Sequence, residues 1–150
     1  MRHYSKSSVL WLVLATWFML VITPIKATVL TVPEVIQEQT QWCWSATSQA
    51  VFAYYGTNLT QCQIANWTRQ QAGWGNDDCC TNPGGAICNQ PNWMYGASGS
   101  IEDILSNWGI SCQTYSRALT QAEVETEIAH CRPFYIRWGW STGGLSLIHI

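Results

Sequence analysis

The stretch that decides the fold has the sequence VPEVIQEQTQWCWSA over residues 32–46, and it leads into an alanine-rich segment. After Cys43 there is no proline or glycine until Gly56, and three alanines recur at helical spacing. This pattern predicts a buried helix that begins directly after Cys43 and ends at Gly56. Because a helix N-terminus has unsatisfied N–H groups and favours an anion, a thiol placed there is biased toward the nucleophilic thiolate.

Residues 1–27 are predicted to be a secretory signal peptide. Basic residues precede an unbroken apolar run of 14 residues from Val9 to Ile22, and Ala27 offers a small residue at a cleavage point. The run is shorter than the ~20 residues that a membrane-spanning helix needs, although an uncleaved anchor is an open alternative. We therefore expect a secreted or periplasmic protein without stable membrane association after cleavage.

Length and charge limit the classes of protein that remain. A chain of 150 residues with 47% hydrophobic content fits one folded domain and not a disordered polymer. Charged residues make up 11% of the chain, and removal of residues 1–27 leaves four basic residues, none of them lysine, against nine acidic ones. Such an acidic chain is not expected to bind nucleic acid.

Seven cysteines all come after the predicted cleavage point and therefore meet an oxidising compartment: Cys43, Cys62, Cys79, Cys80, Cys88, Cys112 and Cys131. Three disulfides are expected, with a pairing that the sequence does not determine, and one thiol is left over. Since the other six lie where bridging is easy, the leftover thiol is most economically Cys43. The alternative is that Cys43 is bridged and another cysteine is not.

The rest of the mature chain predicts helices first and strands last, an order typical of an α+β domain. Capping signals and glycine stops predict helices over residues 61–72, 101–108 and 121–131. Residues 110–115 and 134–140 have strand patterns, and residues 141–144 form a turn signal. Residues 73–99 contain six glycines and no hydrophobic period, so this long loop needs cysteine ties to be stable.

The segment around Cys43 resembles the active-site segment of papain-like cysteine peptidases. The motif Gln41-Trp-Cys-Trp-Ser-Ala46 is similar to that of a secreted bacterial branch related to staphopains and to avirulence-type effector peptidases, and residues 132–144 resemble that branch's approach to its histidine. The resemblance covers about residues 32–144. It implies a papain-like cysteine peptidase fold with a helical N-terminal half and a C-terminal antiparallel sheet, the sheet half being incomplete in this chain.

The resemblance also implies a mechanism. In this family a cysteine thiolate attacks a peptide carbonyl, a histidine moves the proton, and an Asn or Asp orients that histidine. By position, Cys43 is the nucleophile and Gln37, six residues upstream, is the oxyanion donor beside the Cys43 backbone N–H. Gln39 and Gln41 are rivals for the donor, and each of these glutamines could instead be a solvated loop amide. No cofactor is implied, and the substrate is a peptide or protein.

A suitable histidine is absent from the expected position. The family's histidine directly follows the Gly-Gly turn, where this chain has Leu145. His149 lies four residues later, ~13 Å along a strand, which is too far for catalytic geometry. His3 belongs to the signal peptide, and His130 near the end of a predicted helix suits a structural or surface role.

The last six residues, 145–150, have the sequence LSLIHI, which the codons CTG TCT CTT ATA CAC ATC encode. That string matches a transposon mosaic end used as a sequencing adapter, and the match begins where the family pattern breaks. We interpret residues 145–150 as adapter read-through and residues 28–144 as a partial peptidase domain, inactive as given. The alternative is a natural strand in a degenerate homologue that binds peptides without cutting them.

Two other classes of site are suggested by particular residues. A secreted, disulfide-tied binding module is suggested by eight tryptophans after residue 27, although they are spread along the chain. A metal site from the cysteines at 79, 80 and 88 with His130 lacks the paired spacing of zinc modules. The adjacent Asp77 and Asp78 lack the oxygen spacing of a calcium loop, so no metal is expected.

Overall fold

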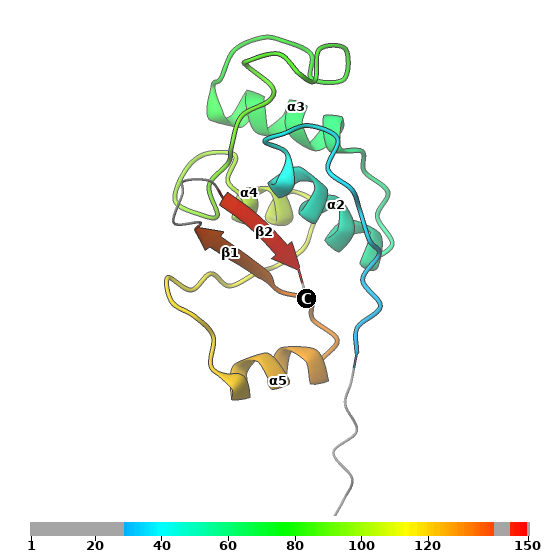
Figure 1. Ribbon diagram of the computed structural model, residues 1–150, viewed down its shortest axis with the longest axis vertical. Coiled ribbons are helices and arrows are strands. Elements are labelled where there is room, and N and C mark those ends of the chain that lie inside the picture. The colour runs from blue at the N-terminus through cyan, green and yellow to red at the C-terminus, as the bar shows by residue number, and fades with distance from the viewer. Residues whose placement is uncertain (1–28, 140–144, 150) are drawn as a thin grey trace, which may run out of the picture.

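The computed structural model of the chain describes residues 29–139 and 145–149, with side chains over residues 29–137. The predicted signal peptide and the predicted turn at residues 141–144 lie outside the described residues. Helices precede strands along the described chain (Figure 1): α2 (Cys43–Tyr54), α3 (Gln61–Ala72), α4 (Ile101–Asn107), α5 (Gln121–Ala129), β1 (Tyr135–Gly139) and β2 (Leu145–His149). This order confirms the predicted sequence of helices followed by strands. None of the described helices is long and apolar enough to cross a membrane.

The predicted helix signals are confirmed at the ends of α3, α4 and α5. Thr60 and Thr120 each form a complete capping box with the residue three positions later, and Ser100 caps α4 by accepting from the Asp103 N–H. Helix α3 ends at Gly73, whose φ of +66° is left-handed and suits glycine. Short-range sequence signals therefore determine where these helices begin and end.

Helix α2 lies at the centre of the fold and contacts α3, α4 and β2 (Figure 1). The helix is rich in alanine and other apolar side chains, as its sequence predicts, and most of the residues of α2 are buried. Its larger buried apolar side chains belong to one core cluster together with residues of other parts of the chain: Trp42, Trp44, Val51, Phe52, Ile64, Ala65, Cys79, Cys88, Ile101, Ile104 and Leu105. Helix α5 has no buried residue and lies apart from this core (Figure 1).

Strands β1 and β2 pair antiparallel, with Tyr135 opposite His149 and Gly139 opposite Leu145. The hydroxyl of Tyr135 bonds Ser48 Oγ at 3.0 Å, which ties β1 to the middle of α2. Desolvation in this position raises the pKa of the Tyr135 phenol, so the group stays protonated and remains a hydrogen-bond donor. The predicted strand after Pro133 is therefore confirmed.

The prediction of a strand at residues 110–115 is wrong. These residues alternate between half-buried and exposed, as the pattern indicates, but they form no ladder. Alternating burial requires only an extended chain over the core, whereas a strand also requires a neighbouring backbone with which to pair. The described residues supply no such neighbour.

The long loop over residues 73–99 contains no helix or strand and is held by two disulfides, Cys62–Cys80 and Cys79–Cys88. The expectation that cysteines tie this loop is confirmed, but the expected third disulfide is not formed among the described residues. Cys112 lies in the extended segment before α5, and Cys131 is exposed after it, so both remain thiols.

Removal of the Cys79–Cys88 disulfide by the double substitution Cys79→Ala and Cys88→Ala is expected to lower the free energy of unfolding by about 2–3 kcal/mol. The two cysteines are nine positions apart in the sequence, and the bridge closes the short loop between them. Urea unfolding under non-reducing conditions measures this loss. Cys112→Ala is the matched control, because that thiol is not bridged. An unchanged unfolding free energy in the double variant would show that the loop is held by its other contacts.

Candidate active site

Cys43 is the first residue of α2 and is half-buried. The residue before it, Trp42, occupies the N-cap position and makes no side-chain cap. The other three described helices all have a Ser or Thr cap that satisfies an N–H group of the first turn. Helix α2 therefore presents backbone N–H groups beside the sulfur that no side-chain cap occupies, which favours a bound anion there.

Cys43 lies between two buried tryptophans, and the side chains of both are anchored by hydrogen bonds. The indole of Trp42 donates to the Cys88 carbonyl oxygen at 2.8 Å, and the indole of Trp44 donates to the Gln90 carbonyl oxygen at 2.9 Å. Both side chains are fully buried. Since the neighbours on both sides are anchored in the core, the backbone at Cys43 has little freedom to turn.

Gln37 lies in the turn that leads to Cys43. Its amide nitrogen donates to the carbonyl oxygens of Gln39 and Thr40, at 3.0 and 3.4 Å, and the side chain is exposed. The rival Gln41 is also exposed, whereas Gln39 is half-buried. All three glutamines therefore precede the nucleophile candidate on one short turn, and the Gln37 amide is held there by local backbone acceptors.

Gln61 has a role that its sequence pattern does not indicate, because the pattern places it only inside a capping signal. Its side chain is buried and bonds the backbone on both sides of Gln37: its oxygen accepts from the Glu38 N–H at 2.9 Å, and its nitrogen donates to the Ile36 carbonyl at 2.8 Å. The Gln61 backbone carbonyl in turn accepts from Ser45 Oγ in α2. One buried amide thus joins the segment that carries Gln37 to the helix that carries Cys43.

His130 lies near the end of α2 that is opposite to Cys43. It caps the C-terminal end of α5, where its Nδ1 lies 2.7 Å from the Thr126 carbonyl oxygen. The next residue, Cys131, accepts a hydrogen bond from the Tyr54 hydroxyl at the last residue of α2. Because α2 has 12 residues and is therefore ~18 Å long, His130 lies toward its opposite end from Cys43. The structural role predicted for His130 fits this position.

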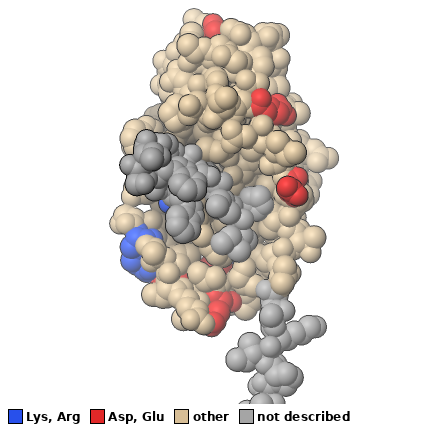
Figure 2. All heavy atoms as spheres, viewed as in Figure 1, with Lys and Arg blue, Asp and Glu red and all other residues tan. Residues whose placement is uncertain are grey.

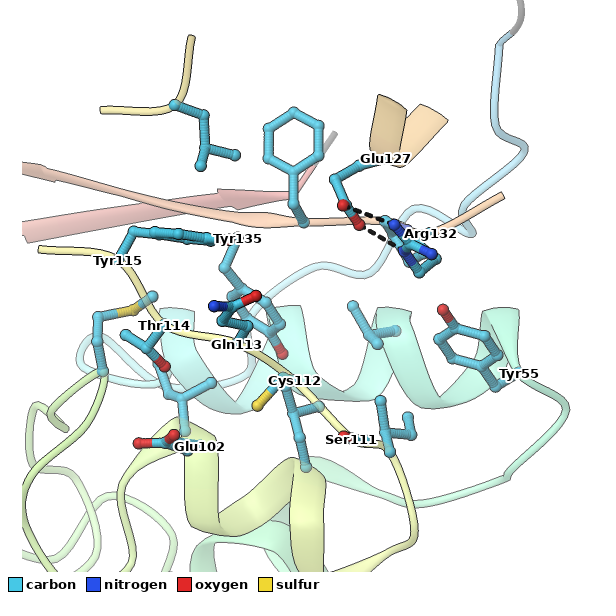
Figure 3. Close-up of a pocket in the computed structure, with 18 of the residues that line it drawn as sticks. Tyr55, Glu102, Ser111, Cys112, Gln113, Thr114, Tyr115, Glu127, Arg132 and Tyr135 are labelled. Atoms are coloured by element: carbon cyan, nitrogen blue, oxygen red, sulfur yellow. Dashed lines mark hydrogen bonds and ion pairs between the residues drawn. The ribbon is translucent and has the colours of Figure 1, made fainter. Parts of the chain in front are cut away.

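A cavity of about 360 Å³ is also distant from Cys43. It lies between the C-terminal half of α2, α4, the extended segment at 110–117 and the start of β1 (Figure 3). The Arg132–Glu127 ion pair is on its wall, and so is Cys112, whose pKa is raised by burial and by Glu102 and Asp103. A thiol that stays protonated is a poor nucleophile, which sets Cys112 apart from a catalytic cysteine.

Charge is sparse on the face shown in Figure 2. Of the four arginines in the described residues, Arg117 and Arg132 are in ion pairs, Arg69 is buried, and Arg137 lies over the Trp93 ring. These four are all of the Lys and Arg residues of the described chain. Their contacts leave no cluster of unpaired basic side chains among these residues.

The three cysteines considered for a metal site are bridged in the described chain. Cys79, Cys80 and Cys88 are all in disulfides, and no group of three or more His, Cys, Asp or Glu side chains there could hold an ion. Disulfide sulfur is not a thiolate, so it is unsuited to zinc.

Comparison with protein families identifies the chain. The sequence model of the Peptidase_C39 like family matches residues 29–149. The chain belongs to this family. The match includes Gln37, Cys43 and every described element, and it supports a cysteine peptidase with a peptide or protein as its class of substrate. A search of the curated proteins and a search of the solved structures each found no match.

For this Peptidase_C39 like domain, Gln61→Ala is expected to lower the free energy of unfolding by about 1–3 kcal/mol, because Glu38 N–H and Ile36 C=O lose their partner. Gln70→Ala is the matched control, since Gln70 is an exposed glutamine on the same helix. Urea unfolding of both variants checks the difference. Equal stability of the two variants would contradict this role of the Gln61 side chain.

Proposed function

We propose that this chain carries the nucleophile half of a secreted or periplasmic papain-like cysteine endopeptidase, with Cys43 as nucleophile and Gln37 as oxyanion donor. The observation that carries the proposal is Cys43 at the N-terminus of α2, which lacks a side-chain cap, between two anchored tryptophans in a chain of the Peptidase_C39 like family. The branch related to staphopains and avirulence-type peptidases is part of the same proposal.

The proposed reaction begins with attack of the Cys43 sulfur on the carbonyl carbon of a peptide bond, which gives a tetrahedral oxyanion. The Cys43 N–H and the Gln37 amide donate to that oxyanion, and the Gln37 amide gives up its longer bond, to the Thr40 carbonyl, to do so. The C–N bond then breaks, the amine leaves with a proton from a histidine, and a thioester remains on the sulfur. Water hydrolyses the thioester, the acid is released, and the thiol is restored. No cofactor takes part.

The register of β1 supports position 145 as the place of that histidine. Cys131 lies against Tyr54 and Tyr135 lies against Ser48, so the chain runs from the C-terminal end of α2 toward its N-terminus. Ser48 is five residues, ~7.5 Å, from Cys43. From Tyr135 the strand advances four residues, ~13 Å, to Gly139, in the direction of the N-terminal end of α2.

Position 145 pairs with Gly139, whereas His149 pairs with Tyr135 beside the middle of α2. The backbone register therefore favours residue 145 and disfavours His149 as the partner of Cys43. The proposal that residues 145–150 are adapter read-through in place of a natural histidine and the chain beyond it rests on the codon match, whereas the family match extends through residue 149. On this proposal the chain with Leu145 is inactive, and its domain spans residues 28–144 as a partial unit.

The rival interpretation as a binding module rests on exposed tryptophans. Among the six tryptophans with described side chains, Trp42 and Trp44 are fully buried, and three more pack against the core. Trp93 is the exposed one, at 59%. A sugar-stacking surface needs several exposed rings, so this part of the chain favours the peptidase. A peptide-binding protein without activity is the second rival, and a natural Leu145 would favour it.

The test is covalent labelling of the chain with an epoxysuccinyl peptide, in which a cysteine sulfur opens the epoxide and forms a thioether. We expect Leu145→His to speed labelling of Cys43 about a hundred-fold, as a positioned general base does. Leu147→His is the matched control, because it places the imidazole ~7 Å further along β2. Mass spectrometry assigns the labelled cysteine.

If the exposed Cys131 is labelled fastest and Leu145→His does not change the rate at Cys43, labelling simply follows solvent exposure, and the proposed nucleophile is contradicted. An equal response to Leu147→His would contradict the proposed position of the histidine. Cys43→Ala in the Leu145→His background is expected to abolish the fast phase and to leave labelling of Cys112 and Cys131 unchanged.

A further inference from the structure

The turn before Cys43 is bound by three consecutive residues of the disulfide-tied loop. Four hydrogen bonds of the described chain join residues 40–44 to residues 88–90. Two of them are the indole contacts of Trp42 and Trp44. The other two come from the side chain of Asn89: its Oδ1 accepts from the Gln41 N–H at 2.9 Å, and its Nδ2 donates to Thr40 Oγ1 at 2.9 Å.

We propose that Asn89 is a positioning residue for the Cys43 nucleophile, acting through the Thr40 hydroxyl and the Gln41 backbone N–H; this inference rests on the proposed function. An amide is suited to the task because it donates and accepts at once, and here both groups are used on adjacent residues of the turn. The contact joins residues nearly fifty positions apart in the chain, so it is tertiary and not part of the local turn.

Asn89 is itself held in place. Its N–H donates to the Gly85 carbonyl at 2.8 Å, and the preceding residue, Cys88, is fixed by its disulfide to Cys79. Both of these cysteines are fully buried. The amide therefore projects from a rigid base, and the geometry of the Cys43 turn depends on a loop that the disulfide closes.

The need for this support arises from the uncapped N-terminus of α2. Without a side-chain cap, the turn before Cys43 has its own closing bond from Trp42 N–H to the Gln39 carbonyl, at 3.0 Å. Loss of Asn89 frees Gln41 and Thr40 from the loop and leaves the Trp42 and Trp44 indole contacts as the remaining bonds to residues 88–90, so that the first turn of α2 frays more readily. A frayed first turn stabilises a thiolate less, because the N–H groups beside the sulfur are no longer aligned.

The test measures the pH profile of Cys43 alkylation by iodoacetamide, with mass spectrometry of the three thiols in the same molecule. In Asn89→Ala we expect the midpoint for Cys43 to rise by about 0.7 pH unit, equivalent to about five-fold less thiolate at neutral pH. The profiles of Cys112 and Cys131 are expected to stay as in the parent. A midpoint is used because exposure alone changes a rate without moving it.

Asn82→Ala is the matched control, since Asn82 is an exposed asparagine of the same loop that bonds Asp77 and not the turn. Thr40→Ser, which keeps the hydroxyl, is expected to match the parent, and Thr40→Val is expected to move the midpoint in the same direction as Asn89→Ala. These variants leave Asn89 in place, so they test the contact even if Asn89→Ala folds poorly.

An unchanged Cys43 midpoint in both Asn89→Ala and Thr40→Val would overturn the inference. A parallel change at all three cysteines, or an equal change in Asn82→Ala, would also overturn it, because either result indicates general loosening. Failure of the proposed function is distinguishable: in that case the parent Cys43 reacts no more readily than Cys112 at any pH, whatever stands at position 89.

Discussion

The structure depends on how the N-terminus of α2 is held. This helix is the central element of the fold, yet its first turn has no Ser, Thr, Asp or Asn cap. Tertiary contacts take over that work: the carbonyls of Cys88 and Gln90 hold the tryptophans beside Cys43, and Gln61 holds the chain on both sides of Gln37. A missing cap costs an ordinary helix about 1 kcal/mol of stability, and the proposed oxyanion site would account for its absence here.

The disulfides hold the loop that supports the turn before Cys43. They tie a loop that has no regular structure, and the tied loop carries the acceptors on which the Cys43 turn rests. Support for the Cys43 turn thus comes from covalent closure elsewhere in the chain, an arrangement suited to an oxidising compartment. The cavity beside Cys112 lies toward the other end of α2 and is not part of this arrangement.

Much of the framework is predictable from the sequence because it is encoded locally. The capping boxes at Thr60 and Thr120 and the glycine stop at Gly73 each involve residues within one helical turn. The predictions of a strand at residues 110–115 and of a third disulfide were wrong because each depends on a partner that is close in space, and the local sequence does not show whether that partner is present. Gln61 and Asn89 were not predictable for the same reason: a single amide in a loop or at a helix start has no pattern, and its role exists only through contacts 23 to 49 residues away.

Position 145 decides whether the proposed chemistry is possible, since the proposed mechanism needs a histidine beside Cys43, and the register pairs residue 145 with Gly139 at the end of β1 that points away from Tyr135 and Ser48. The most direct measurement is the sequence of the source gene through codon 145 and onward. We predict a histidine codon at 145, with an Asn or Asp codon downstream in a continuing reading frame. A leucine codon at 145 with a stop after Ile150 would contradict this proposal, and would leave a protein of this family that binds peptides without cleaving them.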